Sequence, residues 1–425
     1  MQLYEHQKQG LEAVMDRDHV AFYWDMGLGK TFAGSEKMMQ LGEKVNLVVC
    51  QKSKIQDWFD HFKDNYQINT VIRDLTGVKD FNVEIGFINQ CKKQRTIYIG
   101  IINYDLIWRR PELLKLQDFT LLLDESSLIQ TETAKRSKFI LRMIPKNVIL
   151  LSGTPTGGKY EKLWSQMHLL GWNISKQLYW KQFVNVEYLD TMKGSIPIVT
   201  GYKNVERLKR KMADYGCQFL KTDEVFDLPD QNFQKLRIPA SKEYRKFRQT
   251  KIVQVEGKEL VGDTTLTKML YERQLCGIYS KDKLKAFSDL VESTDDRLVV
   301  FYNFTEELEA MKKAIEDTDT EWSFVNGRNK DLRAYEAVNH SVTFVQYQAG
   351  AMGLNLQKAN KMVFYTLPLS SELFEQAKKR IHRIGQERPC FYYLMICNGT
   401  VEEKILRTLE MRKDYTAELF EREEQ

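Results

Sequence analysis

The chain has 425 residues, 43% of them hydrophobic and 28% charged, which is enough for about two or three domains with large cores and excludes wholesale disorder. Its 63 Lys and Arg residues against 58 Asp and Glu leave a net charge of +5, which permits a phosphate-binding face without requiring one. No signal peptide opens the sequence and no apolar run approaches a membrane span, so we expect a soluble protein of the cytoplasm.

The cysteines are spaced without a Cys-x-x-Cys pair and without the histidine spacing of a zinc site. We interpret them as reduced, buried residues and predict no zinc site. They are Cys50, Cys91, Cys217, Cys276, Cys390 and Cys397.

Short apolar runs alternate with stretches of helical periodicity, and this happens twice. Runs too short for helices, separated by helices, are typical of parallel sheets covered on both faces. We predict an α/β fold with two lobes, residues 1–227 and 228–425, meeting near residues 227–230, with residues 159–289 helical, charged and poor in strands. The runs cover residues 20–24, 45–50, 97–102, 119–123 and 148–151, then 298–302, 322–325, 342–347, 362–366 and 391–396.

A glycine-rich segment, Met26-Gly27-Leu28-Gly29-Lys30-Thr31, follows the first apolar run and is our candidate nucleotide-binding loop. Its glycines let backbone N–H groups turn towards phosphates, and the helical stretch that follows points its positive end at them. Lys30 can reach the β- and γ-phosphates of ATP, and the Thr31 hydroxyl can ligate Mg²⁺. Trp24 stands where the strict phosphate-loop pattern has its first glycine, so an ordinary glycine-rich turn is the alternative.

Two carboxylates, Asp124 and Glu125, follow the apolar run at residues 119–123. A buried strand that ends in carboxylates places them at the carboxyl edge of the sheet, where open α/β folds bind ligands. We predict that Asp124 holds Mg²⁺ and that Glu125 orients and deprotonates the attacking water; a solvated acidic loop is the alternative. The turn at residues 152–155, Ser-Gly-Thr-Pro, either senses the γ-phosphate or is a simple turn.

The second half adds a small-residue loop at 348–356, with Gly353 as a nucleotide-binding candidate, and a basic segment at 375–386 that we predict to be a helix ending at Gly385. Arg380 and Arg383 would then share one helix face. Such a guanidinium pair can clamp the charge that develops on a γ-phosphoryl group, or it can bind DNA phosphates.

Together these segments resemble the Swi/Snf-type ATPases of helicase superfamily two, and they follow that family's order along nearly the whole chain. Leu3-Tyr4-Glu5-His6-Gln7 resembles the adenine-reading opening, and Arg380-Ile381-His382-Arg383-Ile384-Gly385-Gln386 resembles the family's most specific signature. Similar segments also cover residues 25–31, 47–62, 101–107, 152–170, 219–229, 272–276, 299–305 and 399–406.

The resemblance implies two RecA-like lobes, ATP and Mg²⁺ as ligands, and double-stranded DNA as a partner held through its phosphates across both lobes. Gln7 would contact adenine, and segments 47–62 and 101–107 would contact DNA. Arg380 and Arg383 would act as fingers on ATP held by the first lobe. Because the matching segments fill the chain, it resembles the minimal bacterial or bacteriophage branch, working in the bacterial cytoplasm.

Three departures from the family pattern stand near these motifs. Ser126-Ser127 replaces the usual Ala/Gly-His after the acidic pair, so the histidine implicated in coupling is missing. Trp24 replaces a small or acidic residue, and Lys379 replaces a glycine. None of them removes a catalytic group.

Two groups of residues in the region 159–289 each have two possible roles. The run at residues 207–211 is either an extra phosphate contact or a solvated helix face with Val205, Leu208 and Met212 inward. Trp172 and Trp180 are aromatics that we interpret as core rather than as a wedge between base pairs.

A translocase on duplex DNA is the function we predict from these features. The rivals are a strand-separating helicase, which needs a wedge that the sequence does not reveal, and an ATP-switched DNA clamp that does not translocate. Glu125 and both candidate fingers argue against the clamp, since a clamp needs binding more than turnover.

Overall fold

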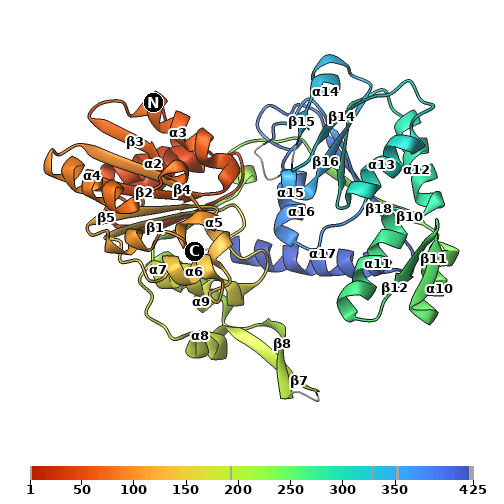
Figure 1. The fold of residues 1–425 in the computed structure, drawn as a ribbon, viewed down its shortest axis with the longest axis horizontal. Helices are drawn as coiled ribbons and strands as arrows, with labels where there is room; N and C mark the ends of the chain where they lie inside the picture. The colour runs from red at the N-terminus through yellow and green to blue at the C-terminus, as the bar shows by residue number, and fades with distance from the viewer. Residues whose placement is uncertain (1, 192–193, 328, 351–353, 421–425) are drawn as a thin grey trace. The chain divides into compact units, whose positions relative to one another are not determined.

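The computed structural model describes residues 2–191, 194–327, 329–350 and 354–420. The chain divides into two compact units, one of residues 1–225 with 414–425 and the other of residues 226–413. Figure 1 shows the helices and strands of each unit.

The first unit is built on a parallel sheet with the strand order β3-β4-β2-β5-β6-β1-β9 among the described residues. Every residue of β2 and β6 is buried, so side chains on both faces of the sheet pack against helices. The strands are β1 (His19–Trp24), β2 (Val45–Cys50), β3 (Thr70–Asp74), β4 (Ile97–Asn103), β5 (Phe119–Asp124), β6 (Asn147–Leu151) and β9 (Cys217–Leu220).

Helices of the first unit pack against both faces of this sheet; those from residue 81 onward contribute to one core cluster, whereas buried residues of the three helices before it, such as Leu11, Met38 and Trp58, lie outside that cluster. The helices are α1 (Glu5–Glu12), α2 (Lys30–Leu41), α3 (Ile55–Asn65), α4 (Phe81–Lys93), α5 (Tyr104–Ile107), α6 (Lys135–Ile140), α7 (Trp164–Leu169), α8 (Lys176–Phe183) and α9 (Val205–Asp214). Trp172 and Trp180 pack against the same core, which confirms our interpretation of these two aromatics.

The second unit has a sheet with the order β10-β18-β17-β13-β16-β14-β15, parallel except for the pairing of β14 with β15. Alternate residues of β13 enter two separate cores: Val299 and Phe301 one, Val300 and Tyr302 the other. The strands are β10 (Gln231–Ile238), β13 (Leu298–Tyr302), β14 (Glu321–Val325), β15 (Lys330–Asp331), β16 (Ser341–Gln346), β17 (Lys361–Phe364) and β18 (Cys390–Cys397).

Helices supply the other side of both cores in the second unit. They are α10 (Lys242–Thr250), α11 (Thr265–Gly277), α12 (Lys281–Glu292), α13 (Thr305–Ala314), α14 (Arg333–Ala337), α15 (Tyr347–Gly350) and α16 (Ser371–Lys378), and α17 runs from Val401 to Phe420. Each apolar run predicted as a strand overlaps a strand in the two sheets, so the predicted α/β fold with two parallel sheets is confirmed.

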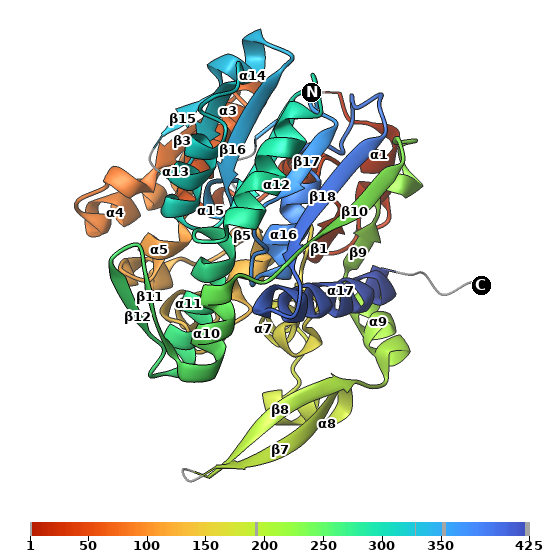
Figure 2. The ribbon, with the colours of Figure 1, turned by 90° about the vertical axis from the view of Figure 1, so that its right-hand side faces the viewer.

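The expectation of few strands in residues 159–289 is wrong. Two antiparallel hairpins lie there, β7 (Val184–Thr191) with β8 (Gly194–Tyr202) and β11 (Ile252–Val255) with β12 (Lys258–Val261), together with the edge strands β9 and β10. Figure 2 shows β7 and β8 extending beyond α8 and α9. Most described residues of β8 and β10 are exposed, so they lack the continuous apolar runs that reveal buried strands.

All six cysteines are buried and free, as predicted. Among the described helices, none combines the length and the apolar character needed to cross a membrane.

Candidate active site

Three neighbouring strands of the first unit end side by side, and the predicted site residues follow their ends. Residue Leu151 at the end of β6 pairs with Phe22 of β1 on one side and with Asp124 of β5 on the other. The glycine-rich loop, the Ser152 turn and Glu125 therefore meet at the carboxyl edge of one sheet. Open α/β sheets bind their ligands at this edge.

The loop between β1 and α2 depends on two glycines in the left-handed region. Gly27 has a φ of +91° and Gly29 a φ of +71°. A Cβ atom on Gly29 would stand 2.1 Å from Nε2 of Gln7, so a side chain there would also displace its neighbour. Gly29 caps the N-terminus of α2, and Lys30 and Thr31 form its first turn. The backbone N–H groups of this turn suit an anion.

Gln7 lies under the loop and is 2% exposed. Its Nε2 donates to the carbonyl oxygens of Leu28 at 3.2 Å and Gly29 at 3.4 Å, while its Oε1 accepts from the backbone N–H of Tyr4 at 2.9 Å. Gln7 therefore ties α1 to the buried Leu28 and to the rest of the loop. To donate to adenine as well, Nε2 would have to exchange one of these bonds, whereas Oε1 has a second lone pair for an adenine donor.

Trp24 packs towards α1 rather than forming the rim of the loop. Its ring meets Phe22 edge-on at 4.8 Å and His6 at 6.0 Å. Gly10 of α1 makes room for it, since a Cβ atom there would lie 2.4 Å from the indole. The large side chain of Trp24 in β1 therefore fills the space that Gly10 leaves in α1.

Lys30 points back into the loop, where its Nζ donates to the carbonyl oxygens of Trp24 at 2.8 Å and Asp25 at 3.0 Å. A Cβ atom on Gly153 would lie 3.5 Å from the same Nζ and 3.3 Å from Cγ of Met26, so the Ser-Gly-Thr-Pro turn packs directly on the loop. The ammonium also acts on the acidic pair: burial raises the pKa of both Asp124 and Glu125, and the charge of Lys30 opposes that rise.

Asp124 ends β5 with a carboxylate that is partly paired. Its Oδ2 accepts a hydrogen bond from Nε1 of Trp58 in α3 at 2.8 Å. Burial raises the pKa of Asp124, and the bond from Trp58 and the charge of Lys30 only partly oppose that rise. A half-buried carboxylate stabilised by additional positive charge fits Mg²⁺, which prefers hard oxygen ligands.

Glu125 has a φ of 57° and a ψ of 60°, a left-handed conformation unusual for a residue with a side chain. Its Oε1 accepts hydrogen bonds from Oγ of Ser152 at 2.6 Å and from Oγ of Ser127 at 3.0 Å. Burial raises the pKa of Glu125, which makes its carboxylate a stronger base than an exposed glutamate. Ser127, which replaces the family histidine, thus holds the acidic pair directly.

The sequence did not reveal that Gln166 and Tyr104 support this site. Gln166, in the middle of α7 and fully buried, accepts at Oε1 from the hydroxyls of Ser126 at 2.7 Å and Tyr23 at 3.0 Å, and donates from Nε2 to the carbonyl oxygen of Pro155 at 2.8 Å. It therefore joins β1, the acidic motif and the Ser-Gly-Thr-Pro turn. The hydroxyl of Tyr104 donates to the carbonyl oxygen of Asp124 at 3.0 Å.

The predicted helix at residues 375–386 is wrong in its second half, because α16 ends at Lys378. Residues from Lys379 to Gly385 form turns instead, and Gly385 has a φ of +91°. The turns bury Gln386, whose Nε2 donates to the carbonyl oxygens of Ile381 and Ala359. A helix continued to Gly385 would not allow this.

Arg380 and Arg383 therefore do not share a helix face. Arg380 is 6% exposed, and Arg383 is half-buried, with its pKa lowered by burial. Both side chains remain charged at neutral pH. Gly353, the remaining candidate for nucleotide binding, lies outside the described residues.

Comparison with known families identifies the class. Residues 6–281 match the SNF2-related domain and residues 282–385 match the helicase conserved C-terminal domain. The chain belongs to the SNF2-related family, which confirms the resemblance drawn from its motifs.

Two of the similar proteins come from Mus musculus and Bacillus subtilis. The chain is 23% identical to a SWI/SNF-related matrix-associated actin-dependent regulator of chromatin subfamily A member 1 from Mus musculus, over 91% of this chain and 40% of that protein. It is 24% identical to the putative ATP-dependent helicase/translocase YwqA from Bacillus subtilis, over 72% of this chain and 36% of that protein. The chain thus spans well under half of the length of these two relatives.

Two further matches extend the comparison. The uncharacterized ATP-dependent helicase YqhH from Bacillus subtilis is 23% identical, over 91% of this chain and 73% of that protein. Among solved structures, the Sulfolobus solfataricus SWI2/SNF2 ATPase core in complex with dsDNA aligns with a TM-score of 0.46 at 18% identity, covering 98% of this chain and 92% of that one.

Proposed function

We propose that the protein is an ATP-hydrolysing motor that moves along double-stranded DNA and remodels DNA or protein–DNA complexes. The observation that carries this proposal is the meeting of the glycine-rich loop, Asp124, Glu125 and Ser152 at one sheet edge, in a chain of the SNF2-related family. A phosphate-binding loop beside two half-buried carboxylates is the arrangement that nucleotide hydrolysis needs.

ATP would bind with its phosphates on the N–H groups of the loop and on Lys30, which would exchange the carbonyl oxygens of Trp24 and Asp25 for phosphate oxygens. Mg²⁺, held by Asp124 and Thr31, would neutralise charge on the β- and γ-phosphates. Glu125, positioned by Ser152 and Ser127, would orient a water and take its proton. Arg380 and Arg383 would stabilise the charge that develops on the γ-phosphoryl group, and Gln7 and Gly353 would complete the nucleotide contacts.

The coupling of DNA to ATP would run through the two segments expected to contact DNA. Trp58 lies in the segment 47–62 and bonds to the Asp124 side chain, while Tyr104 lies in the segment 101–107 and bonds to the Asp124 backbone. A shift of either segment on DNA would therefore move the acidic motif directly. This supports a motor in preference to a clamp that only binds.

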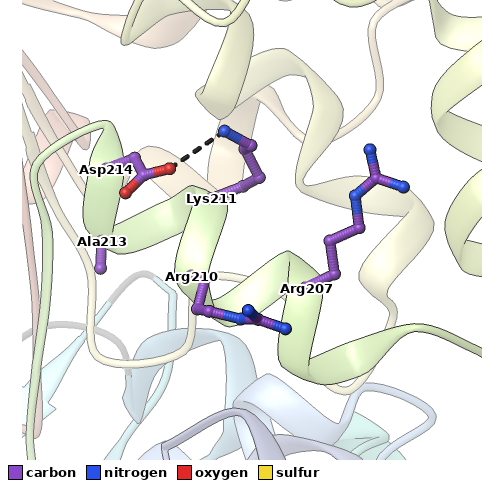
Figure 3. A pocket seen from close by; sticks show the side chains of 5 residues that line it. All are labelled: Arg207, Arg210, Lys211, Ala213 and Asp214. Atoms are coloured by element: carbon purple, nitrogen blue, oxygen red, sulfur yellow. Dashed lines mark hydrogen bonds and ion pairs between the residues drawn. The ribbon is translucent and has the colours of Figure 1, made fainter.

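DNA would be held mainly by phosphate contacts, so its binding should depend on salt and little on sequence. Helix α9 offers one such contact: Leu208 and Met212 are buried as the inward reading expects, and Arg207 and Arg210 line a surface pocket of about 450 Å³ (Figure 3). In the same pocket Lys211 pairs with Asp214 at 3.0 Å.

The protein would belong to the bacterial or bacteriophage branch of the family and work in the bacterial cytoplasm. Two of the relatives named above are bacterial helicases.

The first test compares DNA substrates. We expect blunt duplex DNA to stimulate ATP hydrolysis more than single strands do, and the enzyme to displace the third strand of a triplex while leaving a forked duplex largely unopened. Steady-state hydrolysis and gel-based displacement assays measure both. The exposed β7–β8 hairpin favours the strand-separating alternative, and efficient fork unwinding with stronger stimulation by single strands would establish that alternative.

A second test concerns Gln166 as a positioning residue. Gln166→Met keeps the volume but breaks the links to Ser126 and Pro155, so we expect kcat for ATP to fall about tenfold, the loss of roughly one or two hydrogen bonds in the transition state. The KM for ATP should change little, because Gln166 does not line the loop.

Ser126→Ala is the matched control for Gln166→Met, since it removes only one of these bonds and should have a smaller effect. Thermal melting separates a structural loss from a positioning loss. An equal fall in folded fraction and in kcat would show that Gln166 serves stability alone.

A further inference from the structure

The β7–β8 hairpin and α8 enclose a groove that the proposed motor mechanism does not use. The groove has a volume of about 620 Å³ and lies entirely within the first unit. Its lining comes from α8, from both strands of the hairpin and from the residue that follows β8. The lining residues that bear on its chemistry are Lys176, Trp180, Lys181, Tyr188, Pro197 and Lys203.

The register of the hairpin decides which side chains face the groove. Tyr188 pairs with Pro197, and Val186 pairs with Val199. Because side chains alternate between the faces of a strand, Val186, Tyr188 and Pro197 share the face that lines the groove. Glu187 and Leu189 lie on the opposite face.

The groove combines positive charge with aromatic rings. Lysines contribute all of its charged lining groups among the described residues, and no carboxylate lines it. Lys176 is paired with Glu132 and stands over the Trp180 ring at 5.7 Å. Lys181 and Lys203 are exposed, and Tyr188 is 71% exposed.

We propose that this groove binds a single strand of nucleic acid, with Lys181 and Lys203 on its phosphates and with Tyr188 stacking on its bases. Lysines beside exposed aromatic rings are the pattern of single-strand sites, because every base has a face that stacks. Protein interfaces are depleted in lysine at their centres, so a protein partner fits this lining less well.

The groove gives the motor a second contact with DNA wherever a duplex ends in a single strand. This proposal rests on the proposed function only in taking DNA as the ligand, and it does not require the hairpin to open base pairs. The wild-type protein should therefore bind a duplex with a single-stranded overhang about tenfold more tightly than a blunt duplex of equal length.

The test measures binding of fluorescent blunt and overhang duplexes by the full chain without ATP. Tyr188→Ala should abolish the tenfold preference for the overhang, and Tyr188→Phe should retain it. Lys181→Ala and Lys203→Ala should each lower the salt dependence of overhang binding by about 0.7 in log–log slope. Leu189→Ser on the opposite face of the hairpin is the matched control and should change nothing.

Affinity for blunt duplex, and the hydrolysis it stimulates, should be the same in every one of these variants. A wild-type protein that does not distinguish the two duplexes would overturn the proposal, as would a Leu189→Ser effect as large as that of Tyr188→Ala. Loss of a protein partner in the Tyr188 variant, with overhang binding intact, would reassign the groove to that partner. Failure of the motor proposal would appear separately, as absent stimulation by blunt duplex.

Discussion

Glu125→Gln is expected to slow ATP hydrolysis by about 10²–10⁴-fold while leaving ATP binding in place. The amide keeps the shape of the side chain, so it can still accept bonds from Ser152 and Ser127, but it cannot take a proton from water. Single-turnover hydrolysis and equilibrium binding of a fluorescent ATP analogue measure the two quantities separately.

Lys30→Ala is the contrasting variant, because Lys30 would contact the phosphates themselves and its loss should weaken nucleotide binding as well. Ser152→Ala removes one of the two bonds to the Glu125 carboxylate and should give an intermediate rate. Turnover near the wild-type rate in Glu125→Gln would mean that another group is the base.

Replacing Arg380 or Arg383 by Ala should lower the rate of ATP turnover by about a thousandfold, the lower end of the effect of an arginine finger. ATP affinity should change much less, because the first unit would supply most contacts to the ground state. Arg383→Lys should recover only part of the rate, since a lysine keeps the charge without the planar fork of donors.

Arg388→Ala is the matched control for these variants. Arg388 lies just beyond the segment 375–386 and pairs with Asp296 at 3.0 Å, so its removal should leave turnover nearly unchanged. Because Arg380 is buried, its variant must also be checked by thermal melting. A variant that loses DNA binding but hydrolyses ATP normally once bound would place these arginines on DNA phosphates.

The parallel sheets were predictable because both of their faces are covered, which forces continuous apolar runs such as β2 and β6. The β7–β8 hairpin was not predicted, for the converse reason. Tyr188 and its neighbours in β7 are exposed, so no buried face imposes a pattern on them. The same lack of burial hid the edge strand β10.

The parts of the candidate site that could be predicted are those where the local backbone or chemistry requires one type of residue. Gly27 and Gly29 adopt positive φ angles, and the carboxylates end a buried strand, so local sequence reveals both. Gln166 gives no such signal, because its partners Tyr23, Ser126 and Pro155 come from three distant segments. The turn after Lys378 was missed because charge spacing does not reveal the burial of Gln386.

At Glu125 the left-handed backbone lowers the stability of the fold, whereas the side chain at the same position is the proposed base for ATP hydrolysis. A residue with a side chain pays about 1–2 kcal/mol for this conformation, and a glycine adopts it freely. A screen of random variants for heat resistance would therefore favour glycine at this position, even though that change removes the carboxylate. A selection for thermal stability must therefore also select for ATP hydrolysis, because otherwise it will enrich folded variants that do not hydrolyse ATP.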